Sequence, residues 1–115
     1  MKALVLAPTA APELVDLPDA SGAELLAGLQ AAVGGYIEPI ITWDGARLYV
    51  NDEGRVRRMT YNRLATVLAH RFGWPGDSLF GTAVVIGSAA GDDGLHDCDV
   101  PAGAVELVEK LMDRL

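Results

Sequence analysis

Cysteine is almost absent from this chain of 115 residues, and the one present, Cys98, has no second cysteine with which to form an intramolecular disulfide. A single thiol also excludes a metal site built from several cysteines. Proteins of reducing compartments keep their thiols free, so the cysteine content is consistent with a cytoplasmic protein.

Long apolar runs are missing as well. No stretch approaches the ~18 apolar residues of a membrane span. The apolar run 3–7 is shorter than the ~7–15 residues of a signal peptide core, and it is better interpreted as a first strand. We therefore expect a cytoplasmic protein without membrane contact. There is also no serine in a nucleophile-elbow pattern and no phosphate-binding P-loop, so we expect a non-enzymatic protein without a cofactor.

Half of the residues are hydrophobic, so the chain can bury a core, and we expect one domain over residues 1–115. Apolar runs predict strands over residues 2–7, 13–17 and 82–86, the last of them central and covered on both faces. Apolar residues at helical spacing predict helices from the capping box 21–24 to a Gly34-Gly35 stop, from about Tyr61 to Phe72, and onward from Pro101. The predicted fold class is α+β, with a largely antiparallel sheet of five to six strands and three packed helices.

A β-hairpin is predicted around Asp44-Gly45, because a type I′ turn needs positive φ at both of its central positions. Pairing outward from this turn puts Trp43 opposite Ala46, Ile41 opposite Leu48 and Pro39 opposite Val50. Alternation then gives one apolar face that must be core. Its members are Ile37, Pro39, Ile41, Trp43, Ala46, Leu48 and Val50.

The other face of this hairpin has two interpretations. It carries Tyr36, Glu38, Ile40, Thr42, Arg47, Tyr49 and Asn51. Antiparallel sheets commonly leave one face in water, so these residues could form an ordinary solvated surface. Alternatively, Tyr36, Glu38, Tyr49 and Asn51 could form a shallow polar and aromatic site.

Basic residues are concentrated in one segment. Residues 55–71 carry five of the nine basic residues and no acidic residue, so the remaining four basic and sixteen acidic residues give the rest of the chain a net charge of −12. One interpretation is that Arg55–Met59 forms an edge strand whose arginines prevent strand addition. The other is an anion pocket, in which arginines lie near a helix N-terminus capped by Asn62 or Thr60. With a pI of about 4.6, nucleic-acid binding is not expected.

The segment 87–99 is predicted to be an acidic loop. Its potential metal ligands are Asp92, Asp93, His96, Asp97, Cys98 and Asp99. Their spacing matches neither an EF-hand nor a known zinc arrangement, which favours a solvated loop over a metal site. Asp99 is also suited to be the N-cap of the last helix. Tyr61, Trp74 and Phe80 around the loop 73–81 could form an exposed contact patch, or two of them could instead fill the edge of the core, so the oligomeric state stays open.

Four blocks of sequence resemble a known family. They are VGGYIEPI at 33–40, LYVNDEG at 48–54, NRLAT at 62–66 and GTAVVIG at 81–87. The chain resembles the family of the domain of unknown function 3846 over residues 33–87, while the first strands and the last helix lie outside this likeness. Members look like small proteins of phages, actinobacteria and their mobile elements. The resemblance implies an accessory protein of a phage or mobile element that works in the host cytoplasm, and it implies no activity.

Three functions follow as hypotheses. The first is a binding module that holds a host protein or a small anionic, nucleotide-like ligand. Its predicted site residues are Tyr36, Glu38, Tyr49, Asn51, Glu53, Arg58, Asn62 and Arg63. The second is an acidic decoy that mimics nucleic acid and occupies a host DNA-binding enzyme. The third is a hydrolase that uses Glu38 or Glu53.

Overall fold

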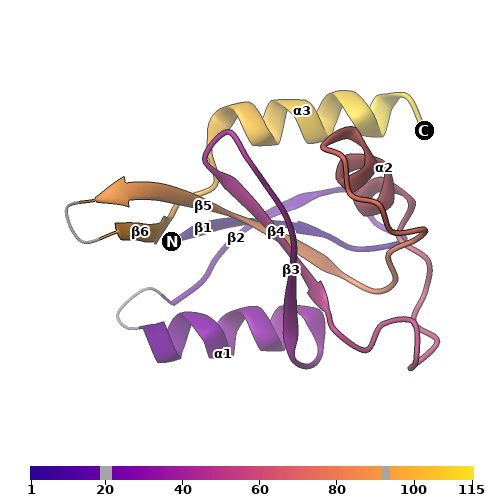
Figure 1. The fold of residues 1–115 in the computed structure, drawn as a ribbon, viewed down its shortest axis with the longest axis horizontal. Helices are drawn as coiled ribbons and strands as arrows, with labels where there is room; N and C mark the ends of the chain where they lie inside the picture. The colour runs from indigo at the N-terminus through magenta and orange to yellow at the C-terminus, as the bar shows by residue number, and fades with distance from the viewer. Residues whose placement is uncertain (19–21, 92–93) are drawn as a thin grey trace.

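A computed structural model of the chain describes residues 1–18, 22–91 and 94–115, and within them six strands and three helices. The strands are β1 (Lys2–Leu6), β2 (Glu13–Asp16), β3 (Ile37–Trp43), β4 (Ala46–Asn51), β5 (Ala83–Gly91) and β6 (Gly94–Cys98), and the helices are α1 (Gly22–Val33), α2 (Arg63–Arg71) and α3 (Ala102–Asp113). All pairings are antiparallel in the order β2-β1-β5-β4-β3, and β6 pairs with β5 (Figure 1). The predicted α+β fold is confirmed.

Helices cover both faces of the sheet (Figure 1). On one face, Leu25 and Leu29 of α1 pack with Val84 of β5, and on the other face Leu68 of α2 and Val108 of α3 belong to a larger apolar cluster. Residues 83–86 of β5 are completely buried, which confirms the prediction of a central strand covered on both sides.

Local signals in the sequence place several boundaries correctly. Asp44 and Gly45 have φ values of 39° and 78°, as the hairpin turn requires. Gly34, with φ 79°, follows the last residue of α1, and its N–H donates to the Gln30 carbonyl oxygen. Asn62 is the N-cap of α2. The capping box predicted for α1 includes Ser21, which lies outside the described residues.

The predicted register of the hairpin is wrong beyond Ile41. Trp43 does face Ala46 and Ile41 does face Leu48, but a β-bulge between Pro39 and Ile41 places Pro39 opposite Tyr49 and Glu38 opposite Val50. Proline has no N–H to contribute to a ladder, so an irregularity next to Pro39 costs little. The extra residue reverses the alternation of side chains in the part of β3 before the bulge. Glu38 therefore lies on the same face as Val50, and each face of the hairpin contains residues that were predicted for the other face.

The prediction that the second face of the hairpin is exposed to water is also wrong. Tyr49 is 8% exposed and Asn51 is 4% exposed, and Tyr49 belongs to the apolar cluster under α1. The helix covers this face because its apolar stripe, which includes Leu25, Leu29 and Val33, has to be buried against the sheet. No ligand can therefore reach the middle of this face without displacing α1.

Arg55–Met59 is not an edge strand. Consecutive turns run over residues 52–58, closed by hydrogen bonds such as Met59 N–H to the Gly54 carbonyl oxygen (2.9 Å), and Arg58 has φ 56°. A β-carbon added to Gly54 would come within 2.6 Å of the Phe80 carbonyl oxygen, so the turn packs closely on the chain before β5. Glycine allows this close approach, and an extended strand would lose it.

The described residues of the predicted loop 87–99 form two paired strands instead. β5 continues to Gly91, and β6 returns along it with Ser88 opposite Asp97. The small and polar residues of this segment show no alternation that would predict a strand, although their backbone pairs regularly. Asp99 is not an N-cap, because its Oδ1 accepts from the Lys2 N–H (2.7 Å), and Pro101 is the N-cap residue of α3 without a side-chain hydrogen bond.

Candidate functional site

Asn51, the last residue of β4, connects the end of α1 to the turn 52–58. Its Nδ2 donates to the Val33 carbonyl oxygen (3.1 Å), and its Oδ1 accepts from the Glu53 N–H (2.8 Å). Carbonyl groups at the end of a helix have no partner within the helix, so the first bond satisfies one of them. Asn51 thereby fixes the point at which the chain leaves the sheet.

Two hollows flank this end of β4, and both have Asn51 and Asp52 in their walls. The first cleft has a volume of about 300 Å³ and the second cleft about 200 Å³. The first cleft lies towards the segment 74–80 before β5, and the second lies towards the end of α1.

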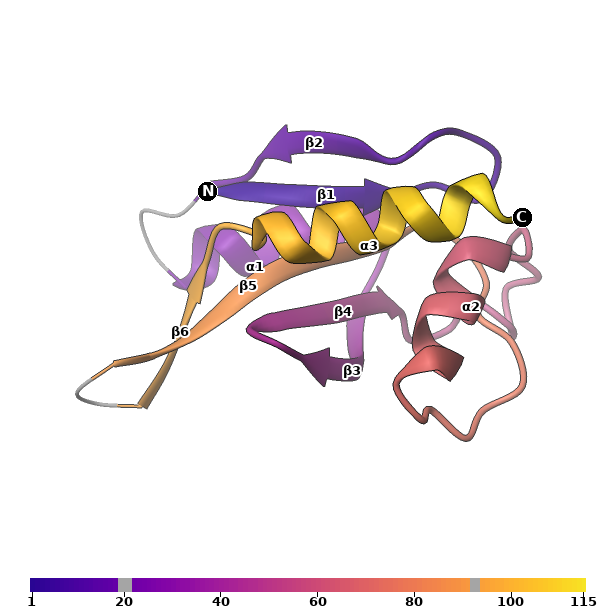
Figure 2. The ribbon, with the colours of Figure 1, turned by 90° about the horizontal axis from the view of Figure 1, so that it is seen from above.

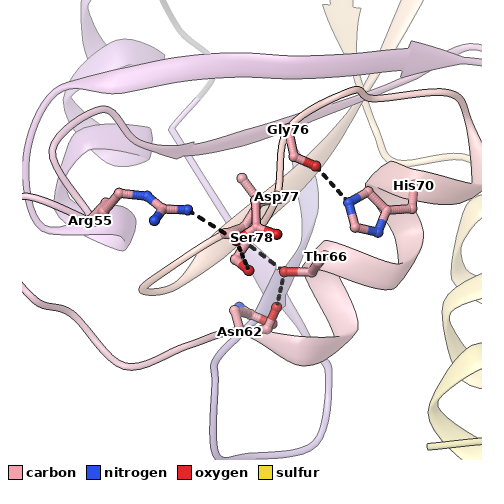
Figure 3. Close-up of polar contacts among 8 residues, drawn as sticks. Arg55, Asn62, Thr66, His70, Gly76, Asp77 and Ser78 are labelled. Carbon is pink, nitrogen blue, oxygen red and sulfur yellow. Dashed lines mark hydrogen bonds and ion pairs between the residues drawn. The ribbon is translucent and has the colours of Figure 1, made fainter.

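Helix α2 holds the wall of the first cleft (Figure 3). Thr66 Oγ1 donates to the Asn62 carbonyl oxygen (2.8 Å) and accepts from the Leu79 N–H (2.9 Å). His70 Nε2 lies 2.8 Å from the Gly76 carbonyl oxygen, which fits a protonated Nε2 as donor. The His70 ring also stacks on Trp74, with 5.7 Å between the ring centroids. The wall is therefore fixed at both ends by hydrogen bonds to one helix.

The first cleft holds more carboxylates than cations. Glu38, Asp52 and Asp77 line it together with a single guanidinium, that of Arg55. Arg55 lies 3.7 Å from Asp77 and 5.0 Å above the centre of the Phe80 ring. Glu38 and Asp52 have no ion-pair partner among the described residues. Two carboxylates are thus available beside the aromatic side chains of the wall.

The second cleft is smaller and its one guanidinium is already paired. Arg57 Nε lies 3.3 Å from Glu53 Oε2 within the turn. Tyr36, at 69% exposure, stands at the surface of this cleft, and Gln30 of α1 lines it as well. Two carboxylates, Asp52 and Glu53, line this cleft with one guanidinium, so negative charge is in excess as in the first cleft.

Half of the predicted site residues lie at these clefts. Glu38 lines the first, Tyr36 and Glu53 line the second, and Asn51 is part of both. Glu38 and Glu53 do not face each other across one hollow, so the hydrolase hypothesis gains no support from the geometry.

The other predicted site residues lie elsewhere. Tyr49 is in the core under α1 and Asn62 is 1% exposed at the start of α2. Arg58 is exposed on the turn and lines neither cleft, and Arg63 lines a separate hollow beside residues 7–11. The predicted residues therefore do not form one site, and the anion pocket expected from the arginines is not assembled by them.

Sequence reasoning missed Trp74, Asp52 and Asp77 as cleft residues. The sequence indicates Trp74 only as part of a contact patch with Tyr61 and Phe80. Tyr61 and Phe80 do contact each other edge to face (5.9 Å between centroids), but Trp74 stacks on His70. The Trp-Pro-Gly-Asp-Ser sequence at 74–78 predicts a loop. The loop lines the first cleft only because its contacts with α2 hold it in place.

The family model for a domain of unknown function (DUF3846) matches residues 1–113 of the chain. The chain belongs to this family. The likeness is thus wider than the sequence blocks at 33–87 indicated, and β1, β2 and α3 are part of the DUF3846 domain. Neither curated proteins nor solved structures gave a significant match to the chain.

The described part of this DUF3846 protein contains neither a cluster of metal ligands nor a membrane-spanning helix. No group of three or more histidine, cysteine, aspartate or glutamate side chains in residues 1–18, 22–91 and 94–115 could hold a metal ion. Asp92 and Asp93 of the predicted acidic segment lie outside these residues. None of the three described helices has the length and apolar content that a membrane crossing requires.

Tyr49→Phe is expected to change neither stability nor ligand binding. The Tyr49 hydroxyl accepts a long hydrogen bond from Arg47 Nη1 (3.3 Å), and the ring packs under α1, so the free energy of unfolding should change by less than about 1 kcal/mol. Urea unfolding of both proteins measures this difference. Loss of binding in a Tyr49→Phe variant of unchanged stability would show instead that the hydroxyl contacts a ligand.

Proposed function

We propose that this DUF3846 protein is a non-enzymatic binding module that holds a basic side chain of a protein partner in the first cleft. The observation that carries the proposal is the pair of carboxylates, Glu38 and Asp52, without an ion-pair partner among the described residues and beside the aromatic rings of Trp74 and Phe80. An accessory role in a phage or mobile element, with a partner in the host cytoplasm, is part of the proposal.

Carboxylates and aromatic rings together favour a cation. A guanidinium or ammonium group gains charge-assisted hydrogen bonds from carboxylates, and it is attracted to the face of an aromatic ring. Arg55 above Phe80 is an example within the chain itself. A volume of about 300 Å³ accommodates one long basic side chain but not a folded segment.

The small anionic ligand is a weaker candidate. Arg55 and Arg57 are each within 4 Å of a carboxylate, and an anion in either cleft would also meet Asp52. The acidic decoy is weaker for a different reason. A mimic of nucleic acid needs a continuous acidic surface, whereas Arg55, Arg57 and Arg58 interrupt it in one turn.

The proposal is tested with N-acetyl-arginine methylamide as a minimal probe, followed by ¹⁵N NMR spectra of the protein. We expect millimolar binding that shifts the backbone signals of residues 50–55 and the indole signal of Trp74. Glu38→Gln with Asp52→Asn should weaken binding tenfold or more, because both unpaired charges are removed while the side-chain shapes are kept.

The matched control is the neutral isostere N-acetyl-citrulline methylamide, which should not bind. Inorganic phosphate and adenosine monophosphate test the anionic alternative on the same spectra. If a phosphate compound shifts residues 50–55 and the arginine compound does not, the proposal is wrong and the cleft is an anion site.

A further inference from the structure

A groove runs along α3 on the side of β2, at the sheet edge opposite to the clefts. The groove consists of three adjoining hollows. From the beginning of α3 to its end, their volumes are about 430, 330 and 280 Å³. The first two share Leu14, Val105 and Glu109, and the last two share Ala11 and Met112, so they are continuous. Figure 2 shows α3 crossing β1 while β2 extends beyond it uncovered.

The walls of this α3–β2 groove are apolar and accessible. Leu14 of β2 is 53% exposed and Met112 of α3 is 38% exposed, and Leu4 closes the floor. Val105 and Met112 are seven residues apart and so lie on one side of the helix. Leu14 and Leu4 face each other in the β1–β2 pairing and point to the same side of the sheet.

Carboxylates surround these apolar residues. Asp99, Glu106, Glu109 and Asp113 line the two larger hollows, and the one lysine there, Lys2, is 2.9 Å from Asp16. The hydrogen bond and charge of Lys2 lower the pKa of Asp16, as expected for a formed ion pair. Lys2 is therefore already engaged, and the other cation of the lining is Arg63 in the smallest hollow, so the four carboxylates leave the groove with an excess of negative charge.

We propose that the α3–β2 groove binds an amphipathic basic α-helix of a protein partner. The excess of carboxylates favours a positively charged partner over a second copy of this chain, whose net charge is −7. The apolar walls require apolar side chains on the same partner. This surface is separate from the first cleft, so the inference is independent of the proposed function.

A helix fits this groove better than an added strand. The twelve residues of α3 are about 18 Å long at ~1.5 Å per residue, which is room for roughly three turns of a parallel neighbour. Helices packed side by side on a sheet lie ~8–10 Å apart, which places a second helix over β1 and β2. A strand added to the edge of β2 would leave Val105 and Met112 uncovered.

The test uses three fluorescein-labelled synthetic peptides and fluorescence anisotropy. The first is a helix of leucine and lysine with leucines at i, i+3, i+4 and i+7, the second replaces every lysine by glutamate, and the third alternates valine and lysine as a strand. We expect the leucine–lysine helix to bind, the glutamate helix not to bind, and the alternating peptide to bind at least tenfold more weakly.

Leu14→Glu is the decisive variant. It adds a negative charge, so non-specific attraction of a lysine peptide would grow, whereas loss of the apolar contact should weaken binding tenfold or more. The control Leu26→Glu makes the same change on exposed α1, on the other face, and should bind as the parent does. Met112→Gln tests the helix wall without a change of charge and should weaken binding about fivefold.

Three results would overturn the inference. The first is the lack of specific binding of the leucine–lysine helix, seen either as no binding or as equal binding to the Leu14→Glu and Leu26→Glu proteins. The second is tighter binding of the alternating peptide, which would indicate strand addition. The third is a dimer in light scattering that Leu14→Glu converts to a monomer, because the groove would then be an interface between copies.

Discussion

Asn62→Ala is expected to lower the free energy of unfolding by about 4 kcal/mol, a large part of the ~5–15 kcal/mol of an ordinary domain. The Asn62 Nδ2 donates to the carbonyl oxygens of Leu6 (2.8 Å) and Gly81 (2.9 Å), and Oδ1 accepts from the Ala65 N–H (3.0 Å) as the N-cap of α2. A buried group that loses its partner costs about 1–3 kcal/mol, and this substitution leaves three such groups. Urea unfolding monitored by tryptophan fluorescence measures the loss.

Asn62→Asp separates the two roles of this side chain. It keeps an oxygen for the Ala65 N–H but turns a carboxylate towards two carbonyl oxygens, so at neutral pH it should be at least as destabilising as Asn62→Ala. Stability should recover as the pH falls below ~5, because a protonated carboxyl can donate to one of the carbonyl oxygens; the folded state then binds more protons than the unfolded state. An Asn62→Ala protein of parental stability would contradict this structural role.

The two roles of Asn62 illustrate what the sequence contains and what it does not. Its position before a helix predicts a cap, and that prediction is correct because capping is local. Its other partners, Leu6 and Gly81, are 56 and 19 residues away in the chain. Only the pairing of β1 with β5 brings them together, so an interpretation based on neighbouring arginines assigned Asn62 to an anion pocket.

The fold was predictable where short-range rules decide the structure. The Asp44-Gly45 turn, the Gly34 stop and the apolar run of β5 each depend on backbone freedom or burial within a few residues. The bulge between Pro39 and Ile41 was not predictable, because Pro39 lowers the cost of an irregularity but does not determine the register of the strand pairing. β6 was missed for a related reason, since a strand of small and polar residues is recognised by its partner and not by its own pattern.

The candidate site was predictable only in part. Glu38, Tyr36, Asn51 and Glu53 lie at the clefts because the end of a hairpin brings its polar residues near one another. Their distribution over two clefts follows from the bulge, which moves Glu38 to the face of Val50. Trp74 joins Glu38 only through the attachment of the loop to α2, and this contact has no signal in the local sequence.

Gly87→Ala is expected to destabilise the protein by about 3 kcal/mol, although alanine is normally the better residue for an ordered backbone. A β-carbon at Gly87 would overlap the Asp99 carbonyl oxygen and lie 2.8 Å from Cys98 Sγ. The obstacle is backbone, where the chain crosses β5 on its way from β6 to α3, so it cannot move like the end of a flexible side chain. The overlap can be relieved only if β6 moves away from β5. Inserting atoms into a packed interior typically costs ~1–3 kcal/mol or more in the free energy of unfolding.

Gly103→Ala is the matched control, because it makes the same change sixteen residues later with the opposite expected sign. Nothing lies within 4 Å of a β-carbon at Gly103, which is exposed in the first turn of α3, so alanine should stabilise the protein by about 0.5–1 kcal/mol. Thermal unfolding of the two variants beside the parent gives both values under one condition.

Because Asp99 and Val100 hold the start of α3 against Lys2, the Gly87→Ala protein should also lose binding in the α3–β2 groove, whereas the Gly103→Ala protein should keep it. A Gly87→Ala protein as stable as the parent would mean that the crossing over β5 is looser than this packing requires.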